Sequence, residues 1–158
     1  MSWTLRRATD ADLEAIMAIE TAMFETDAWS PATMAAEIGG PHGYYLVAEA
    51  PDGGVDGYAG LLAPEGSGQA DIQTIAVVEQ ARRRGLGRTL MLALLDEARR
   101  RGATEVFLEV RADNPGAQAL YRQLGFAEIA VRPNYYQPDG VDAVIMRLAV
   151  PEHQATLA

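Results

Sequence analysis

The sequence predicts one mixed α/β domain built from about seven strands and about four helices. A chain of 158 residues has the length of a single domain, and 49% apolar residues are enough to form a sizeable core. Strand patterns alternate with helix start and stop signals in the order βααβββαβαββ, and no repeat or low-complexity linker interrupts them. We expect the domain to cover residues 1–150 and the small, polar residues 151–158 to form a flexible tail.

The helices are predicted from local capping signals. Thr9 and Asp12 have the spacing of a capping box, which opens the first helix. Ser30 and Asn114 each precede a proline, and a proline is well placed at the first position of a helix. Gly102 ends a long amphipathic helix. The predicted helices cover about residues 9–24, 30–38, 89–101 and 114–125.

The strands are predicted from short runs of apolar and β-branched residues that lie between turn signals. Residues 51–54, Pro-Asp-Gly-Gly, are typical of a hairpin, so the runs on either side should pair with each other. The turn-rich residues 134–142 should separate the last two strands. The predicted strands are residues 5–8, 44–49, 58–62, 70–77, 105–110, 126–131 and 143–148.

Composition excludes several classes of function. Thirteen basic and 22 acidic residues give a net charge of −9, which disfavours nucleic-acid binding and attracts a cationic peptide. The absence of cysteine excludes a Cys nucleophile and thiolate metal sites, and two histidines are too few for a metal cluster. The N-terminus lacks the apolar stretch of a signal peptide, and no run of 18 apolar residues could span a membrane. We therefore expect a cytoplasmic protein that needs no metal.

A basic, glycine-containing loop follows the predicted strand 70–77 and leads into a helix. Glycines at this position let a ligand approach the backbone, and the free N–H groups of the following helix attract an anion such as pyrophosphate. A dinucleotide fingerprint would need a third glycine where Leu90 stands, and a Walker loop would need Gly-Lys-Ser/Thr. A solvated basic turn that only caps the helix is the alternative interpretation. The loop consists of Arg82, Arg83, Arg84, Gly85, Leu86, Gly87 and Arg88.

The context of this loop resembles the GNAT family of acetyl-CoA-dependent N-acetyltransferases. The resemblance includes Ile75-Ala76-Val77 before the loop and Asn114, Ala119-Leu-Tyr121 and Gly125-Phe126 after it. It implies a GNAT fold with a mixed, mostly antiparallel central sheet, and acetyl-CoA as cosubstrate without a metal. The implied cofactor-binding residues are Ile75, Ala76, Val77, Arg82, Arg83, Arg84, Gly85, Leu86, Gly87, Arg88, Asn114 and Tyr121.

A narrower resemblance points to the RimI-type subgroup, which acetylates the N-terminal alanine of a ribosomal protein. It is carried by Leu108 to Asn114 and by Asn134-Tyr-Tyr136, and residues 24–30 resemble the Phe-Pro-Trp-Ser segment of the subgroup. Ala28 stands where that segment has proline, which affects the expected shape of the substrate loop.

The resemblance implies two catalytic residues. Glu109 would act as the general base, directly or through water, although an acid on a strand can also simply face solvent. Tyr121 would donate a proton to the CoA thiolate, although a core aromatic with a wet hydroxyl is the ordinary alternative. Asn114 would contact the pantetheine or a nearby phosphate, and it can cap its helix at the same time.

Aromatic and acidic residues are candidates for binding the acceptor. Trp29, Tyr135 and Tyr136 could form a wall around a peptide N-terminus, or they could pack beneath a loop. Acids in the same two segments could recognise arginines downstream of the first residue of a substrate, although most surface acids have no specific partner. These acids are Glu25, Asp27, Asp139 and Asp142.

The first functional hypothesis is transfer of acetyl from acetyl-CoA to the α-amino group of a protein, with the N-terminal alanine of a small-subunit ribosomal protein as the expected acceptor. Transfer would be direct within a ternary complex, because no cysteine can carry the acetyl group. The alternatives are a protein lysine, a polyamine or an antibiotic amine as acceptor, or a regulatory module that binds acetyl-CoA without turnover. The sequence does not define the oligomeric state.

Overall fold

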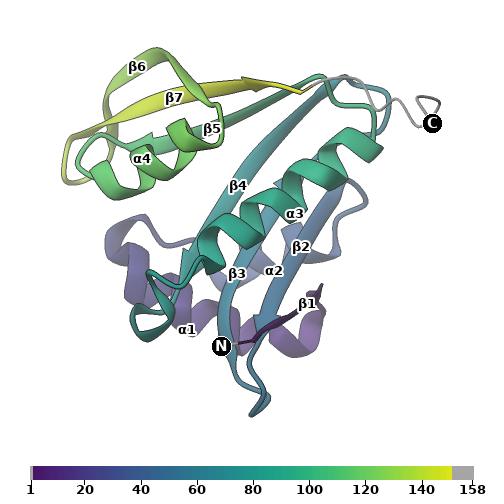
Figure 1. The fold of residues 1–158 in the computed structure, drawn as a ribbon. Helices are drawn as coiled ribbons and strands as arrows, with labels where there is room; N and C mark the ends of the chain where they lie inside the picture. The colour runs from purple at the N-terminus through teal and green to yellow at the C-terminus, as the bar shows by residue number, and fades with distance from the viewer. Residues whose placement is uncertain (1, 151–158) are drawn as a thin grey trace.

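The computed structural model describes residues 2–150, which form a seven-stranded mixed sheet flanked by four α-helices (Figure 1). The predicted fold class is therefore confirmed. The helices are α1 (Leu13–Phe24), α2 (Pro31–Gly39), α3 (Leu86–Arg100) and α4 (Pro115–Gln123), with short 3-10 turns η1 (Asp10–Asp12), η2 (Glu25–Asp27) and η3 (Glu79–Ala81). The strands are β1 (Thr4–Arg7), β2 (Gly43–Glu49), β3 (Val55–Leu62), β4 (Gln69–Val77), β5 (Glu105–Arg111), β6 (Ala127–Tyr136) and β7 (Val141–Ala149).

The strands lie in the order β1-β2-β3-β4-β5-β7-β6, and only the β4–β5 pair is parallel. The connection between these two strands runs through α3, since parallel neighbours require a crossover. The predicted hairpin at residues 51–54 joins β2 to β3, where the Ala50 N–H donates to the Gly54 carbonyl over 2.8 Å. None of the helices in the described part of the chain is both long and apolar enough to cross a membrane.

The predicted capping signals are found where the sequence placed them. The Ser30 hydroxyl accepts from the Thr33 N–H at 3.1 Å, and the Asn114 carboxamide accepts from the Ala117 N–H at 3.2 Å. At the first helix, the Thr9 N–H donates to the Asp12 carboxylate at 2.8 Å. The turn that this pair caps is the 3-10 turn η1, and the α-helix begins one residue after it.

The last hairpin differs from the prediction. We expected a strand at 126–131 and turns over 134–142, whereas β6 runs from Ala127 to Tyr136 and the turn is short. The extension is irregular, because the pairing with β7 shifts between Arg132 and Tyr136 and Asn134 has a φ of 54°. Turn-forming residues therefore lie within an irregular strand, which their composition did not reveal. The expected tail at residues 151–158 lies outside the described residues.

The sheet separates two apolar layers. The helices α3 and α4 pack on one face, with Leu90, Leu94 and Tyr121 in a core that includes Leu46 and Leu61 of the sheet. The helices α1 and α2 cover part of the opposite face, where the buried core includes Ile16, Met34, Tyr45, Val47 and Tyr58. In Figure 1, α3 crosses in front of the sheet while α1 and α2 lie behind it.

The strands β4 and β5 separate after a short paired segment. Their parallel pairing covers only Gln69–Asp71 of β4 and Glu105–Phe107 of β5. A register shift in the β3–β4 pair leaves Gln73 as an extra residue, and such a bulge bends its strand. The C-terminal parts of β4 and β5 diverge as a result (Figure 1), and this divergence creates an opening in the middle of the sheet.

Candidate active site

A cavity of about 530 Å³ lies at this opening, on the face of the sheet that carries α1 and α2. Its walls come from four separate parts of the chain: the η2 loop, β4, β5, and the end of β6 with the following turn. The lining residues are Thr26, Asp27, Trp29, Asp71, Ile72, Gln73, Leu108, Glu109, Tyr135, Tyr136 and Gln137.

Glu109 lies on β5 and lines this cavity. Its neighbours in β5, Leu108 and Val110, are buried in the α3/α4 core, so Glu109 faces the other side of the sheet. The Glu109 carboxylate forms an ion pair with Arg132 Nη1 of β6 at 3.3 Å. Glu109 is exposed, and the space that it faces is the walled cavity. The role as base stays a prediction.

Asp71 is a second carboxylate in the cavity, and our sequence reasoning missed it. It lies on β4, next to β5, and faces the same space as Glu109. Burial raises the pKa of Asp71, and the nearby Glu109 charge raises it further. Asp71 is the only carboxylate in β4, but its closeness to Glu109 became visible only with the strand register, which pairs Asp71 with Phe107, two residues before Glu109.

The three predicted aromatic residues meet at this cavity. Trp29 lies in the segment between η2 and α2, and Tyr135 and Tyr136 lie at the end of β6. The two tyrosine rings pack edge to face with centroids 5.1 Å apart. Burial and then Glu109 raise the pKa of Tyr136, so its hydroxyl stays neutral. The structure thus brings the predicted wall together around the predicted base.

A buried glutamate that the sequence analysis missed supports this wall. Glu20 of α1 is 2% exposed and accepts a hydrogen bond from the Trp29 backbone N–H at 2.9 Å and another from the Tyr58 hydroxyl. Burial and this glutamate raise the pKa of Tyr58, which keeps the donor protonated. Glu20 therefore fixes the start of the segment that carries Trp29.

The four predicted acids have different environments. Asp27 lines the cavity, and Asp139 lies close by, since both bond to Arg111. Asp142 instead accepts from the Asn134 N–H at 2.9 Å within the last hairpin, and Glu25 lies in the turn that ends α1. Only Asp27 and Asp139 are thus placed beside the acceptor cavity.

The basic loop lies on the other face of the sheet, at the N-terminus of α3. Gly85 has a φ of 82°, which favours glycine, and it is the N-cap residue of this 15-residue helix. Leu86 is buried and anchors the helix start, whereas Gly87 is half-buried and a Cβ there would meet only Leu120, at 3.6 Å. The first turn of α3 can therefore present backbone N–H groups to an anion.

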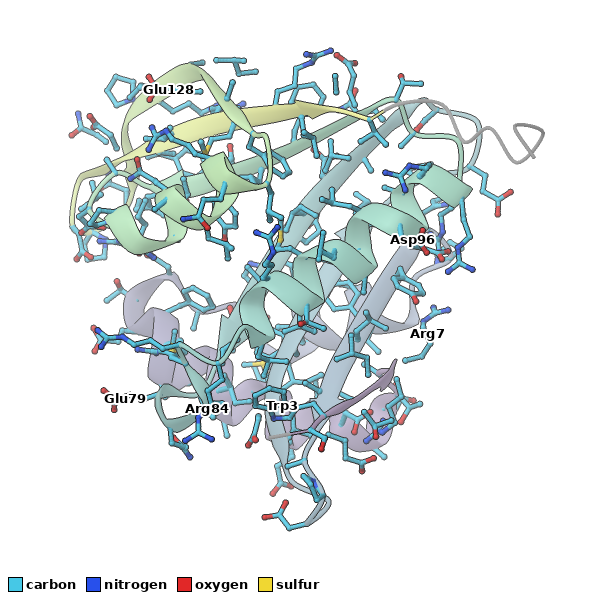
Figure 2. All side chains as sticks on the ribbon, viewed as in Figure 1. Trp3, Arg7, Glu79, Arg84, Asp96 and Glu128 are labelled. Carbon is cyan, nitrogen blue, oxygen red and sulfur yellow. The ribbon has the colours of Figure 1, made fainter. Side chains whose placement is uncertain are left out.

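The arginines of this loop divide into two groups. Arg82 turns back onto the protein, where its Nε donates to the Val77 carbonyl at 3.2 Å and its Nη2 contacts Met23 Sδ at 2.6 Å. All four arginines, Arg82, Arg83, Arg84 and Arg88, are exposed. Figure 2 shows Arg84 projecting from the loop before α3. The charge of this group suits a pyrophosphate, and Arg82 in addition fastens the loop to β4.

The end of β4 offers a free backbone edge. Ile75, Ala76 and Val77 pair with Ala59, Tyr58 and Gly57 of β3, but their other edge faces the opening because β5 has already diverged. The side chains of these three residues belong to the two cores, as predicted. An extended ligand can pair with this edge in the manner of an added strand.

The helix α4 places Tyr121 on the cofactor side of the sheet. Tyr121 is 7% exposed and packs edge to face on Phe126, with ring centroids 6.2 Å apart. Burial raises its pKa to about 12, so the hydroxyl is protonated at neutral pH. The neighbouring Leu120 is the residue nearest to Gly87, which places α4 beside the start of α3. Asn114 caps α4 and is exposed, so its side chain is accessible at this end.

This fold, with a cavity on one side of an opened sheet and a glycine-containing helix start on the other, is that of an acyltransferase. A family model described as the Acetyltransferase (GNAT) family matches residues 13–126. The chain belongs to the GNAT family, and it is an acetyl-CoA-dependent N-acetyltransferase. The family resemblance predicted from the sequence is thereby confirmed.

The chain is similar over most of its length to a curated protein and to solved structures. It is 38% identical over 147 residues to N-alpha-acetyltransferase RimI of Mycobacterium tuberculosis, a match that covers 91% of this chain and 90% of the relative. The crystal structure of the ribosomal-protein-S18-alanine N-acetyltransferase from Escherichia coli has a TM-score of 0.85 and 34% identity, covering 99% of each chain. The crystal structure of Ard1 from Thermoplasma volcanium has a TM-score of 0.83 and 31% identity, covering 96% of this chain and 100% of Ard1.

Proposed function

We propose that this protein acetylates the α-amino group of a protein N-terminus, and that its acceptor is the N-terminal alanine of a small-subunit ribosomal protein. The observation that carries this proposal is the cavity where β4 and β5 diverge, in which an aromatic wall lies beside the carboxylates Glu109 and Asp71. The names of the Mycobacterium tuberculosis and Escherichia coli relatives support the choice of acceptor.

The charge of the cavity suits an ammonium group. Asp27, Asp71 and Glu109 line it, and the chain as a whole carries a net charge of −9, so a positively charged N-terminus is attracted to it. An α-ammonium has a pKa of about 8, and it must lose a proton before it can attack. Glu109 lines the cavity, where it can accept that proton directly or through a water molecule.

Acetyl-CoA supplies the thioester whose carbonyl carbon the amine attacks. The exposed N-terminus of α3, with Arg83, Arg84 and Arg88, would hold the pyrophosphate, and the edge of Ile75–Val77 would hold the pantetheine. Tyr121 keeps its proton at neutral pH because its pKa is about 12, and it would give that proton to the departing thiolate. Solvent then returns a proton to Tyr121, and Glu109 releases its proton to solvent. The transfer is direct, because the sequence contains no cysteine that could carry the acetyl group.

A thiol-release assay with a disulfide reagent tests this proposal, and the protein itself adds no background thiol. Three peptides are compared: one beginning Ala-Arg, the same peptide with a blocked N-terminus, and a blocked peptide with an internal lysine. Release of CoA with the free N-terminus alone is the expected result. Release with the lysine peptide alone would assign the enzyme to side-chain acetylation. No release with any peptide, despite acetyl-CoA binding, would overturn the proposal in favour of a small-molecule acceptor or a non-catalytic sensor.

A further inference from the structure

One arginine connects the two walls of the acceptor cavity. Arg111 ends β5, and its guanidinium bonds to Asp27 of η2, to Asp113 of the following loop at 3.0 Å, and to Asp139 at 3.2 Å. The same guanidinium lies over the ring of Tyr136, 5.1 Å from its centroid. It thus links segments that are 84 and 28 residues away along the chain.

We propose that Arg111 is a positioning residue that sets the width of the acceptor cavity by fastening the η2 loop to the β6–β7 turn. The inference rests on the proposed function for the identity of the acceptor, but not for the fastening itself. Neither the capping signals nor the family resemblance gave this residue a role.

The backbone of Arg111 is itself held in place by a hydrogen bond. The Gln118 side chain of α4 donates to the Arg111 carbonyl at 3.1 Å, so the backbone is tied to the cofactor side of the molecule. Arg111 therefore has a fixed backbone, and its guanidinium bonds to both walls of the cavity. A planar guanidinium with five donors can bond to several carboxylates at once, which an ammonium group cannot do with the same geometry.

Loss of the guanidinium would affect both walls in the same direction. The Asp27 side chain is only 14% exposed, so its charge would lose its partner in a partly buried place. Asp27 would then be repelled by Asp139 and by the cavity carboxylates Asp71 and Glu109. The repulsion would push η2 and the β6–β7 turn apart, and the acceptor would lose contact with Trp29 and Tyr136.

A second arginine on the same sheet is a matched control. Arg147 of β7 bonds to Glu105 at the opposite end of β5, with both side chains 39% exposed. This pair joins only adjacent strands, and neither residue lines the cavity. Replacing Arg147 with methionine removes an ion pair of similar chemistry without touching either wall.

The kinetic test compares Arg111→Met, Arg111→Lys and Arg147→Met with the unaltered enzyme. We expect Arg111→Met to raise the KM for the Ala-Arg peptide by about tenfold or more, while kcat and the KM for acetyl-CoA change by less than about threefold. Arg111→Lys should recover only a minor part of the loss, and Arg147→Met should leave all three constants nearly unchanged. An unchanged peptide KM in Arg111→Met, or an equal rise in both KM values, would overturn the proposal.

A second measurement does not depend on turnover. Amide hydrogen exchange should become faster in residues 24–30 and 134–142 together in Arg111→Met, and it should be unaltered there in Arg147→Met. Unaltered exchange in Arg111→Met, or faster exchange in one segment alone, would show that the arginine does not join the walls. Absence of peptide acetylation by the unaltered enzyme would instead refute the α-amine acceptor, and the exchange result would still decide the role of Arg111.

Discussion

The two faces of the opened sheet are built on different principles. The proposed cofactor face offers backbone groups of contiguous segments: the free edge of Ile75–Val77, the left-handed Gly85 and the first turn of α3. The proposed acceptor face offers side chains from four distant segments, which meet only in the folded chain. A backbone site tolerates a change of side chain unless the new atoms block the approach, whereas a side-chain site depends on each functional group. The predictions below test this contrast.

The largest effect is expected on the cofactor face. Gly87→Val should weaken acetyl-CoA binding by about a hundredfold or more, since a branched side chain would stand where the phosphates must approach the backbone. The structure has room for a Cβ, with Leu120 at an ordinary contact distance of 3.6 Å, so the variant should still fold. Calorimetric titration checks this, with Gly39→Val as the control because Gly39 has open space around it. Native affinity would mean that the helix start does not bind the cofactor.

On the acceptor face, Glu109→Gln should lower kcat by at least about tenfold at neutral pH and leave acetyl-CoA affinity nearly unchanged. Glu105→Gln is a matched control, because Glu105 lies on the same strand and bonds to Arg147 away from the cavity. The rate should be measured from pH 6 to pH 9 with the Ala-Arg peptide. Equal rates for the variant and the unaltered enzyme across this range would remove Glu109 as the base.

Tyr121 lies on the same side of the sheet as α3, and its replacement should have a smaller effect. Tyr121→Phe should lower kcat by about tenfold, since the thiolate would then leave without a proton. The pKa of Tyr121 is raised to about 12, so the hydroxyl is protonated below that pH, and the ratio of the two rates should be constant from pH 7 to pH 9. Tyr44→Phe, at a ring that lies between Arg7 and Arg101, is the control. An unaltered kcat would mean that the Tyr121 hydroxyl is not the acid and that the residue only packs in the core.

The smallest effect concerns a region outside both faces. Asp12→Asn should lower the free energy of unfolding at pH 7 by about 1–2 kcal/mol, because it weakens the capping contact with Thr9 and the ion pair with Arg6. Hydrogen bonding from Arg6 lowers the pKa of Asp12 in the folded protein. The carboxylate therefore stabilises the fold fully above its unfolded pKa of about 3.9, and this contribution is lost as the pH falls through the lower folded value.

Urea denaturation at pH 7 and at pH 3 measures this difference, and kcat should be unaltered. Asp10→Asn, in the same turn, is the matched control. A difference between Asp12→Asn and the unaltered protein that was equal at both pH values would contradict the role of the charge.

The sequence predicted well what is local. The caps at Ser30 and Asn114 each need only a few consecutive residues, and each was found in its predicted place. The glycine loop was predicted too long, because α3 already begins at Leu86, directly after the left-handed Gly85. The family resemblance then supplied Glu109 together with the aromatic wall. What it did not supply were residues whose meaning depends on distant partners. Asp71 needs the register of β4 with β5, and Glu20 needs the approach of Trp29. Arg111 needs two acidic loops that no spacing rule connects.

The extra residue at Gln73 changes which residues of β4 face α3. Before it, the side chains that face α3 are even-numbered, Ala70 and Ile72; after it, they are odd-numbered, Ile75 and Val77. In a strand whose apolar residues alternate, a switch of the apolar positions from even to odd numbers therefore indicates a bulge, and the sequence alone is enough to see it. Deleting one residue between Ile72 and Ile75 would restore a regular alternation of side chains along β4, and the strand would be straighter. Its β4 would follow β5 further, and the opening between the two strands would be narrower.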